Sequence, residues 1–205
     1  MPLVGDGAGP QLWAMHPTDR AVVRGSAQRP ELFDLEMLEA QGVALTGRRS
    51  GGAAVWIEPS AIVWIDVLAP RGSGLWSDDL VQTFLAVGRC WQRAFAQCGV
   101  EATLIENGPG RGGPGDSACW AGHGWGELVL DGAKLVGLSQ RRTRWGARVQ
   151  GMAVVDNSAS LVADALVSLS DAERADVRRA IGSVDLDLDR AALESAAIEA
   201  LLLEL

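Results

Sequence analysis

The stretch ELVLDGAKLVGLSQR, residues 127–141, carries the clearest indication of how the chain folds. Its apolar residues form two short runs, which are separated by the pair Asp131-Gly132. An Asp-Gly pair between two apolar runs favours a tight turn that joins two strands. We therefore expect residues 127–130 and 134–140 to be paired strands around this turn.

Further strands are predicted on both sides of this pair. Residues 1–19 show no comparable pattern and are expected to be a loose lead-in. Segments 54–57 and 61–68 are separated only by Glu58-Pro59-Ser60, so we expect them to form a hairpin. The complete set of additional strands is predicted at 21–24, 43–45, 54–57, 61–68 and 148–155.

Helices are predicted where apolar residues recur every three or four positions. The clearest is 78–97, in which Leu80, Phe84, Val87, Trp91 and Phe95 share one face. The other predicted helices are 30–40, 161–169, 171–181 after a Ser170 cap, and 190–205.

The order of these elements predicts the fold class. Strands predominate up to residue 155 and helices close the chain, which indicates an α+β fold with a mixed, largely antiparallel sheet flanked by helices. With 205 residues, the chain is expected to form one catalytic domain, 1–205, with its core at 20–155 and a helical tail at 156–205. The glycines at 108–115 do not follow a strand and open a helix, so they are no dinucleotide-binding motif.

Composition disfavours several classes of function. The net charge of −8 disfavours nonspecific binding to nucleic acid. The N-terminus has no basic segment followed by an apolar run, and no apolar stretch approaches the ~18 residues of a membrane span, so a cytoplasmic protein is expected. Three cysteines, without a Cys-x-x-Cys pair, argue against a disulfide framework and against zinc, and no metal site is predicted.

The lysine content singles out one residue. The 18 basic residues are 17 arginines and one lysine, Lys134. Lysine is a compact charge on a flexible stem, whereas arginine is a planar fork that is always charged. A chain that otherwise uses arginine can need its one lysine for chemistry, although a chance lysine on the surface has the same signature.

Three segments together resemble the lipoate–protein ligase A family and its octanoyltransferase relatives, which share the biotin/lipoate protein ligase catalytic domain. The first is VVRGSAQ at 22–28, similar to the family's strand that ends in Gly-x-x-Gln. The second is RRSGGAAV at 48–55, similar to Arg-x-x-Gly-Gly-x-Ala-Val. The third is the opening stretch, similar to Asp-Gly-x-Lys-x-x-Gly-x-x-Gln-Arg. The resemblance covers roughly residues 20–155.

The resemblance implies an apolar tunnel for a lipoyl or octanoyl chain, which the ligases activate with ATP and Mg²⁺ as an acyl-adenylate. Lys134 would stabilise charge that develops at the acyl carbonyl or phosphate, from a pocket edge where it contributes little to stability. Arg48 would fork to an anion, and Gly51 and Gly52 would let the backbone approach a ligand. The remaining substrate- or nucleotide-binding positions that it implies are Ala53, Glu127, Gly137, Gln140 and Arg141. The alternative for Gly51-Gly52 is an ordinary turn that binds no ligand.

Cys119 introduces a second mechanism. In cysteine-dependent octanoyltransferases similar to this chain, a nucleophilic cysteine lies at a comparable distance before the motif lysine. A nearby ammonium favours the thiolate, which is the nucleophilic form, so Cys119 would carry an acyl thioester without ATP. His123 is a candidate base for it. The alternative is that Cys119 is a small loop residue without chemistry. The glycine-rich segment 107–118 before it is expected to be a long, mobile functional loop. Cys90 and Cys98 are expected to be small core residues.

Several departures from the family pattern keep three functions open. Trp56-Ile57-Glu58 stands where the ligases have His-Asp, and Gln150-Gly151 where they often have His-Gly. The tail at 156–205 is expected to be too short for the extra C-terminal domain of the ligases, which a second chain could supply. The first hypothesis is a ligase that attaches a lipoyl or octanoyl group to a lysine of a carrier domain. The alternatives are a transferase that uses Cys119, with a lipoyl-carrier domain or acyl-carrier protein as partner, and a non-catalytic relative that only binds an acyl group or cofactor.

Overall fold

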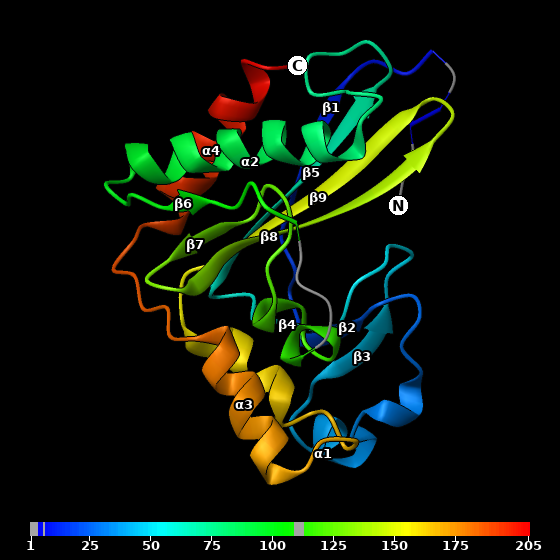
Figure 1. Cartoon of the computed structure of the whole chain (residues 1–205), viewed down its shortest axis with the longest axis vertical. Coiled ribbons are helices and arrows are strands. Elements are labelled where there is room, and N and C mark those ends of the chain that lie inside the picture. The colour runs from blue at the N-terminus through cyan, green and yellow to red at the C-terminus, as the bar shows by residue number, and fades with distance from the viewer. Residues whose placement is uncertain (1–3, 6, 109–112) are drawn as a thin grey trace.

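The computed structural model, which describes residues 4–5, 7–108 and 113–205, has the α+β fold with a largely antiparallel sheet that the sequence predicts (Figure 1). The main sheet has six strands in the order β1 (Gln11–Met15), β5 (Ile62–Pro70), β9 (Gly146–Val154), β8 (Ala133–Thr143), β7 (Leu128–Leu130) and β6 (Thr103–Leu104). All neighbouring pairs in it are antiparallel. A second sheet has the order β3 (Ala44–Gly47), β2 (Ala21–Arg24) and β4 (Val55–Ile57). Its β2–β3 pair is parallel, so the predicted mixed pairing is also confirmed.

The turn at Asp131-Gly132 joins β7 and β8 as predicted. Both residues have positive φ, 50° at Asp131 and 83° at Gly132, which is the backbone that an Asp-Gly hairpin turn requires. Strand β8 continues beyond the predicted end to Thr143 and pairs along its length with β9. The opening stretch therefore supplies the middle of the main sheet.

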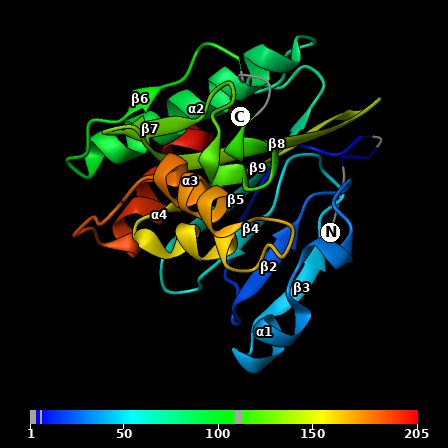
Figure 2. The ribbon, with the colours of Figure 1, turned by 60° about the horizontal axis from the view of Figure 1, so that its bottom comes forward.

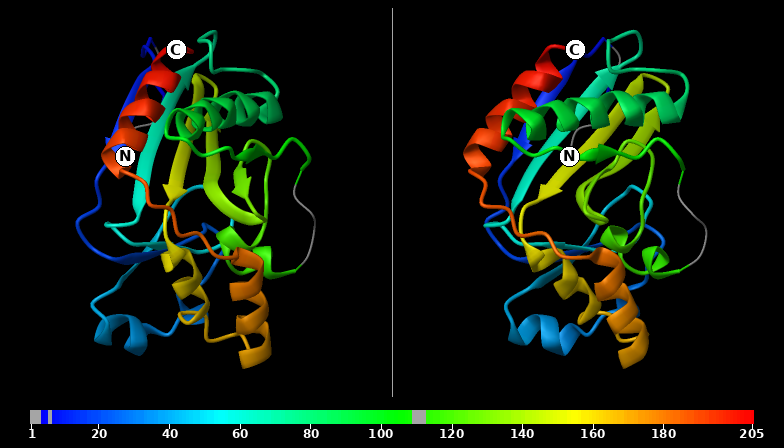
Figure 3. Two further views of the ribbon diagram at one scale, coloured as in Figure 1. Left: turned by 90° about the vertical axis from the view of Figure 1, so that its left-hand side faces the viewer. Right: turned by 60° about the vertical axis from the view of Figure 1, so that its left-hand side comes forward.

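Two helices cover one face of the main sheet. These are α2 (Leu80–Gln97), which Asp79 caps, and α4 (Arg190–Leu202), and Figure 3 shows both on the same side. Alternate residues of β5 point at them, since Val63, Ile65 and Val67 belong to the same buried cluster as the helix residues. The other face of β5 therefore presents Trp64 and Asp66.

The second sheet lies against that other face, together with two more helices. They are α1 (Leu35–Ala40) and α3 (Asp171–Ile181), which come forward in Figure 2. Ser170 and Glu173 form a capping box at the start of α3, as the predicted Ser170 cap implies. Trp64 and Met152 of the main sheet share a buried cluster with Val22 and Trp56 of the small sheet. A second core thus joins the two sheets.

Three predicted elements are wrong, and each error has a tertiary cause. Residues 11–15 are not a loose lead-in but strand β1, because all five pair with residues 64–68 of β5. Segments 54–57 and 61–68 form no hairpin, since β4 pairs with β2 whereas β5 pairs with β1 and β9. Residues 161–169 form no α-helix, and only a 3₁₀ segment, Asn157–Ala163, covers part of that range.

Segments 30–40 and 161–169, both predicted to be helical, contact each other, and this contact limits the helix in both. Phe33 and Leu166 form a β-bridge, and the backbone N–H of Asp34 donates to the carbonyl of Ala165. Phe33 is therefore extended, so the helix begins only at Leu35 after a short 3₁₀ turn. The backbone groups of both segments find partners in each other rather than within a helix. No helix in the described ranges is long and apolar enough to cross a membrane.

Candidate active site

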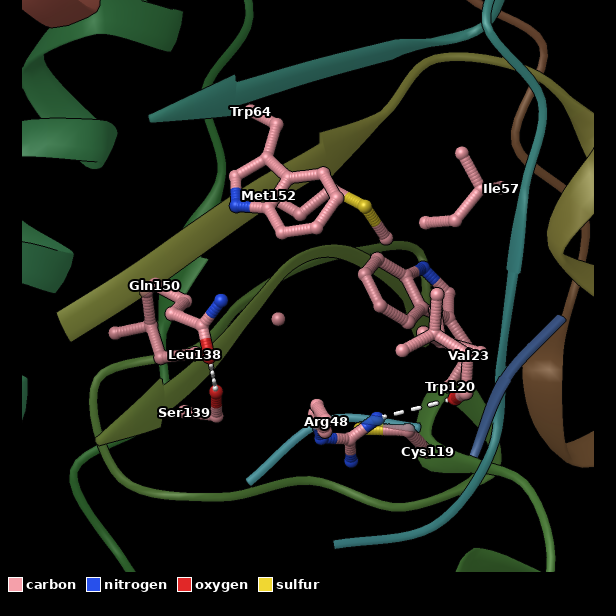
Figure 4. Close-up of a pocket in the computed structure, with 12 residues that line it drawn as sticks. Val23, Arg48, Ile57, Trp64, Cys119, Trp120, Leu138, Ser139, Gln150 and Met152 are labelled. Carbon is pink, nitrogen blue, oxygen red and sulfur yellow. Dashed lines mark hydrogen bonds between the residues drawn. The ribbon is translucent and has the colours of Figure 1, made fainter. Parts of the chain in front are cut away.

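An apolar pocket opens between the two sheets (Figure 4). The main sheet contributes Trp64, Leu138 and Met152, and the small sheet contributes Val23 and Ile57. The pocket is lined mostly by carbon, as a site for an aliphatic chain requires. Its polar lining consists mainly of Arg48, Ser139 and Gln150, which lie with Cys119 and Trp120 around one end of the space.

Cys119 lies between this pocket and a second, more polar cavity. It lines both, and it is partly buried. The second cavity, called here the polar cavity, is also lined by Lys134, Glu127, His123 and Gly52. A thiol at this junction can meet a group that reaches in through the polar cavity while an attached chain occupies the apolar pocket.

Lys134 is buried and supports the backbone at Cys119. Its side chain is 2% exposed, and its Nζ lies 2.8 Å from Oε2 of Glu127. The same ammonium donates a 2.7 Å hydrogen bond to the carbonyl oxygen of Cys119. The structure thus replaces the expected position at a pocket edge with a buried ion pair. Because removing one partner of such a pair costs about 3–5 kcal/mol, we now predict that Lys134 contributes to stability.

Glu127 is fixed by more than its ion pair. Its Oε2 accepts from the backbone N–H of Gly124 at 2.6 Å, and its Oε1 accepts from that of Leu138 at 3.1 Å. These three donors fix the position and orientation of the carboxylate. Glu127 thus positions Lys134 and the strand that carries it.

The first sequence motif also reaches the cysteine segment. The side-chain amide of Gln28 donates to the carbonyl of Ser117 at 3.1 Å, and its oxygen accepts from the N–H of Gly25 at 3.0 Å. Gly25 has to be glycine, because a Cβ there would lie only 1.7 Å from the carbonyl oxygen of Gly52. The Gly-x-x-Gln pattern therefore brings the glycine turn and the cysteine segment together.

The guanidinium of Arg48 donates most of its hydrogen bonds to the glycine turn. It donates to the carbonyls of Gly51, Ala53 and Val23 at distances of 2.7 to 3.3 Å. Burial lowers the pKa of the guanidinium, and its electrostatic interaction with the nearby Cys119 partly opposes that shift. The arginine that the sequence assigns to an anion is thus largely occupied by its own loop.

The two motif glycines have different structural needs. Gly52 has φ +96°, and a Cβ there would come within 2.7 Å of the Arg48 guanidinium. Gly51 has ordinary φ and open space around it. The plain-turn interpretation therefore explains Gly52, while space for a ligand beside the backbone exists at Gly51.

The second and third motifs complete the support of Cys119. The N–H of Cys119 donates to the carbonyl of Ala54 at 2.8 Å. Trp120 donates from Nε1 to the carbonyl of Lys134 at 3.0 Å, and its ring lies over Gly137, where a Cβ would approach it to 2.8 Å. All three motifs therefore contact the short segment 117–120.

His123 lines the same polar cavity as Cys119 and Lys134. Burial lowers the pKa of its imidazole, the Lys134 ammonium adds to that effect, and Glu127 opposes it. Its Nε2 is buried and makes no hydrogen bond to the described residues. A neutral imidazole with an open nitrogen can accept a proton.

The other predicted site residues are distributed more widely. Ala53 lines the polar cavity, and Gly137 lines the apolar pocket. Arg141 lies further along β8, in a separate cavity that Arg48 also lines. Gln140 falls between these positions, so its side chain faces away from them, and its buried amide makes no hydrogen bond to the described residues. The four glycine-loop residues 109–112 lie outside the described residues.

Sequence reasoning missed the polar end of the apolar pocket. Ser50 Oγ lies 3.2 Å from Ser139 Oγ, and both hydroxyls donate to Oε1 of Gln150, at 3.3 and 3.4 Å. The sequence pointed to this cluster only through Gln150, which departs from the family pattern. Trp120 carried no signal, because its role depends on the fold bringing residue 120 onto β8.

Comparison with known proteins places this geometry in a family. Residues 4–201 match the family model of the lipoyl protein ligase A/B catalytic domain. An octanoyl-GcvH:protein N-octanoyltransferase of Exiguobacterium sibiricum is 33% identical over 158 residues, which are 76% of this chain and 52% of that protein. The chain thus spans about half the length of this curated relative.

Solved structures agree on the fold. A bipartite lipoate protein ligase of Thermoplasma acidophilum, studied with its E2 lipoyl domain, aligns with a TM-score of 0.72 at 16% identity, over 95% of this chain and 71% of that chain. A T. acidophilum chain solved with lipoic acid has a TM-score of 0.63 at 18% identity, over 94% and 82%. A lipoate-protein ligase A solved with ATP has a TM-score of 0.62 at 18% identity, over 94% and 81%. The chain belongs to the lipoyl protein ligase A/B catalytic domain family.

Proposed function

We propose that this protein transfers an octanoyl or lipoyl group from a carrier protein to a lysine of a carrier domain, with Cys119 as the covalent relay. The observation that carries the proposal is the support of segment 117–120. Gln28, Ala54 and Lys134 all spend hydrogen bonds on its backbone, and the thiol that they position lines both the apolar pocket and the polar cavity. A residue without chemistry would not need such support.

The reaction proceeds in two steps. The thiol proton of Cys119 passes to a base, for which neutral His123 is the candidate, and the thiolate attacks the acyl carbonyl of the donor. The bond between the acyl carbon and the donor's sulfur or nitrogen breaks, and that atom leaves with a proton. The amine of the acceptor lysine then attacks the thioester, the C–S bond breaks, and an amide is formed while Cys119 is regenerated.

Lys134 contributes charge rather than a transferable proton. Two of its three N–H groups have hydrogen-bonding partners, in Glu127 and the Cys119 carbonyl. The third makes no hydrogen bond to the described residues, and the ammonium also lies 5.5 Å from the centroid of the Trp120 ring. That N–H can stabilise the oxyanion that develops on the acyl carbonyl during both steps. The apolar pocket holds the acyl chain and keeps water from the thioester.

The ATP-dependent ligase is the second candidate. It is favoured by the polar cavity, in which Gly52, Gly115 and Gly124 accompany Lys134 and leave backbone accessible to a ligand. These residues fit a phosphate chain, and bound ATP with Mg²⁺ would supply activation of a free lipoate or octanoate as an acyl-adenylate. In that reaction Lys134 would face the α-phosphate, and Cys119 would only line the site.

One experiment separates the two reactions. The protein is incubated with an octanoylated GcvH-type carrier, or with octanoate, each with and without ATP and Mg²⁺, and is analysed by intact mass. We expect an octanoyl adduct on Cys119 from the carrier alone, which hydroxylamine removes and ATP does not increase. Cys119→Ser should lower the transfer rate by roughly 10³-fold or more, because a serine hydroxyl is much harder to deprotonate than a thiol.

Cys98→Ser is the matched control, because Cys98 ends helix α2 and should leave transfer unchanged. A Cys119→Ser variant that stays fully active and needs ATP would exclude the covalent relay and establish the ligase.

A further inference from the structure

A third cavity lies beside the apolar pocket and is lined by arginine. It is formed between the loop after β3 and strands β8 and β9, and encloses about 220 Å³. We call it the arginine cavity, and its lining includes Arg48, Arg49, Ser50, Arg141, Arg148 and Gln150. It shares Arg48 and Gln150 with the apolar pocket, so a group bound here lies next to the acyl site.

Two of the four arginines are already committed. Arg48 donates to carbonyls of the glycine turn. Arg148 is buried and pairs with Asp66, which is 1% exposed and also accepts from Trp64 at 2.8 Å. These two arginines line the cavity, but their guanidinium groups already bind other groups of the protein.

Arg49 and Arg141 are not committed. Neither makes an ion pair or a side-chain hydrogen bond to any residue of the described ranges, and Arg49 is exposed at the rim. Arg141 lies directly across the strand pair from Arg148, a cross-strand arrangement of like charges that is unfavourable without an anion between them. Among the described residues, Asp66 pairs with Arg148 and no carboxylate pairs with Arg141. The cavity therefore has two guanidinium forks available, and such forks bind carboxylate or phosphate bidentately.

Charge is distributed unevenly over the chain as a whole. The net charge is −8, yet segment 132–155 contains five basic residues and no acidic one. Arg144, at the turn between β8 and β9, is exposed and extends the positive surface beyond the cavity. An acidic protein is repelled by most of this molecule and attracted to this region, which steers its approach.

We propose that the arginine cavity receives a carboxylate side chain of an acidic carrier domain, close to the lysine that gives or accepts the acyl group. The inference rests on the proposed function, because it assigns the surface on which that carrier docks. The exposed charges of Arg49 at the rim and of Arg144 beyond the cavity favour a protein over a nucleotide, since a small ligand would not need charge outside the cavity. The polar cavity around Lys134 is the separate place where a nucleotide would fit.

The test compares Arg49→Gln and Arg141→Gln with Arg179→Gln. Arg179 lies on α3 and its side chain is 70% exposed, so it is a matched surface control. Binding of a GcvH-type carrier is measured directly by fluorescence anisotropy at low and high salt. Each cavity variant should weaken carrier binding about tenfold at low salt and less at high salt, whereas Arg179→Gln should have no effect.

Two further measurements complete the test. The KM for the octanoylated carrier should rise about tenfold relative to the KM for octanoyl-N-acetylcysteamine, which has no carboxylate. Replacing the carrier's acidic residues near its target lysine with amides should make the Arg49→Gln effect disappear, as a double-mutant cycle requires. Because anisotropy needs no turnover, a failed relay at Cys119 would leave this binding result intact.

Equal carrier affinity in the wild type and both cavity variants would overturn the inference. It would also be overturned if the variants lost binding of AMP or inorganic phosphate while carrier binding stayed unchanged, which would make the cavity a phosphate site.

Discussion

The two faces of the six-stranded sheet are both buried, but they differ in chemistry. The face under α2 and α4 has an apolar core around Ile65, Trp91 and Phe95. The face toward the small sheet buries Asp66 with Arg148, and carries Ser139 and Gln150 beside the apolar pocket. Buried charges are costly and are kept where they shape a site. The first face thus supplies stability, and the second supplies the architecture of the site.

This comparison predicts that substitutions on the two faces separate stability from activity. A change under the helices should weaken the fold and leave the site of each folded molecule intact. A change at the residues that support Cys119 should act on transfer, with or without a loss of stability.

The largest effect is expected for Lys134→Ala, because the substitution should lower both the stability and the transfer rate. The variant leaves Glu127 buried without its partner and the Cys119 carbonyl without a donor. Stability should fall by about 3–5 kcal/mol in urea unfolding, and transfer per folded molecule by roughly 10²-fold or more. Full activity in the folded fraction would remove Lys134 from the mechanism.

The double variant Lys134→Met with Glu127→Gln sharpens this result. It removes both charges and keeps one oxygen, which can accept from one of the two backbone N–H groups, of Gly124 and Leu138, that the carboxylate binds. Part of the lost stability should return, whereas transfer should stay low.

Phe95→Ala examines the helix-covered face. Phe95 is fully buried on α2 and contributes to none of the three cavities described above. The cavity that the substitution leaves should cost about 3–5 kcal/mol in urea unfolding. Below the unfolding transition, the transfer rate per folded molecule should match that of the wild type. A comparable loss of transfer would show that the two faces are coupled.

A smaller effect is expected at the glycine turn, where Gly52→Ala and Gly51→Ala form a matched pair. Alanine at Gly52 meets positive φ and the Arg48 guanidinium, which should cost about 1–2 kcal/mol. Alanine at Gly51 meets open space, so its melting temperature should stay near that of the wild type. Reduced transfer in a stable Gly51→Ala variant would instead show that a ligand approaches the backbone there.

The smallest effect concerns the pH dependence of stability. The pKa of His123 lies below its usual value of 6.5, chiefly because of burial. The unfolded chain therefore binds a proton before the folded one does, and stability should fall as the pH drops below about 6.5. His123→Gln should reduce this fall between pH 7.5 and 5.5 in urea unfolding. His16→Gln, at the chain's other histidine, is the control. An unchanged slope in the His123 variant would contradict the assignment.

Most of the secondary structure followed from local pattern, and the errors came from partners distant in sequence. Helix α2 and the β7–β8 turn are set by their own residues, through apolar periodicity and an Asp-Gly pair. Strand β1 and the extended backbone at Phe33 exist because β5 and Leu166 pair with them. A pattern within one segment does not reveal such partners.

The sequence by itself determined the family, the largely antiparallel α+β fold, and the interest of Lys134 and Cys119. Those conclusions depend on short motifs whose residues are close in the chain. Only the tertiary structure decided that Lys134 is buried against Glu127, that Arg48 is occupied by its own loop, and that Arg49 and Arg141 are available. The reason is physical: which donors are spent and which charges are neutralised depends on groups far apart in sequence, and only the folded chain brings them together.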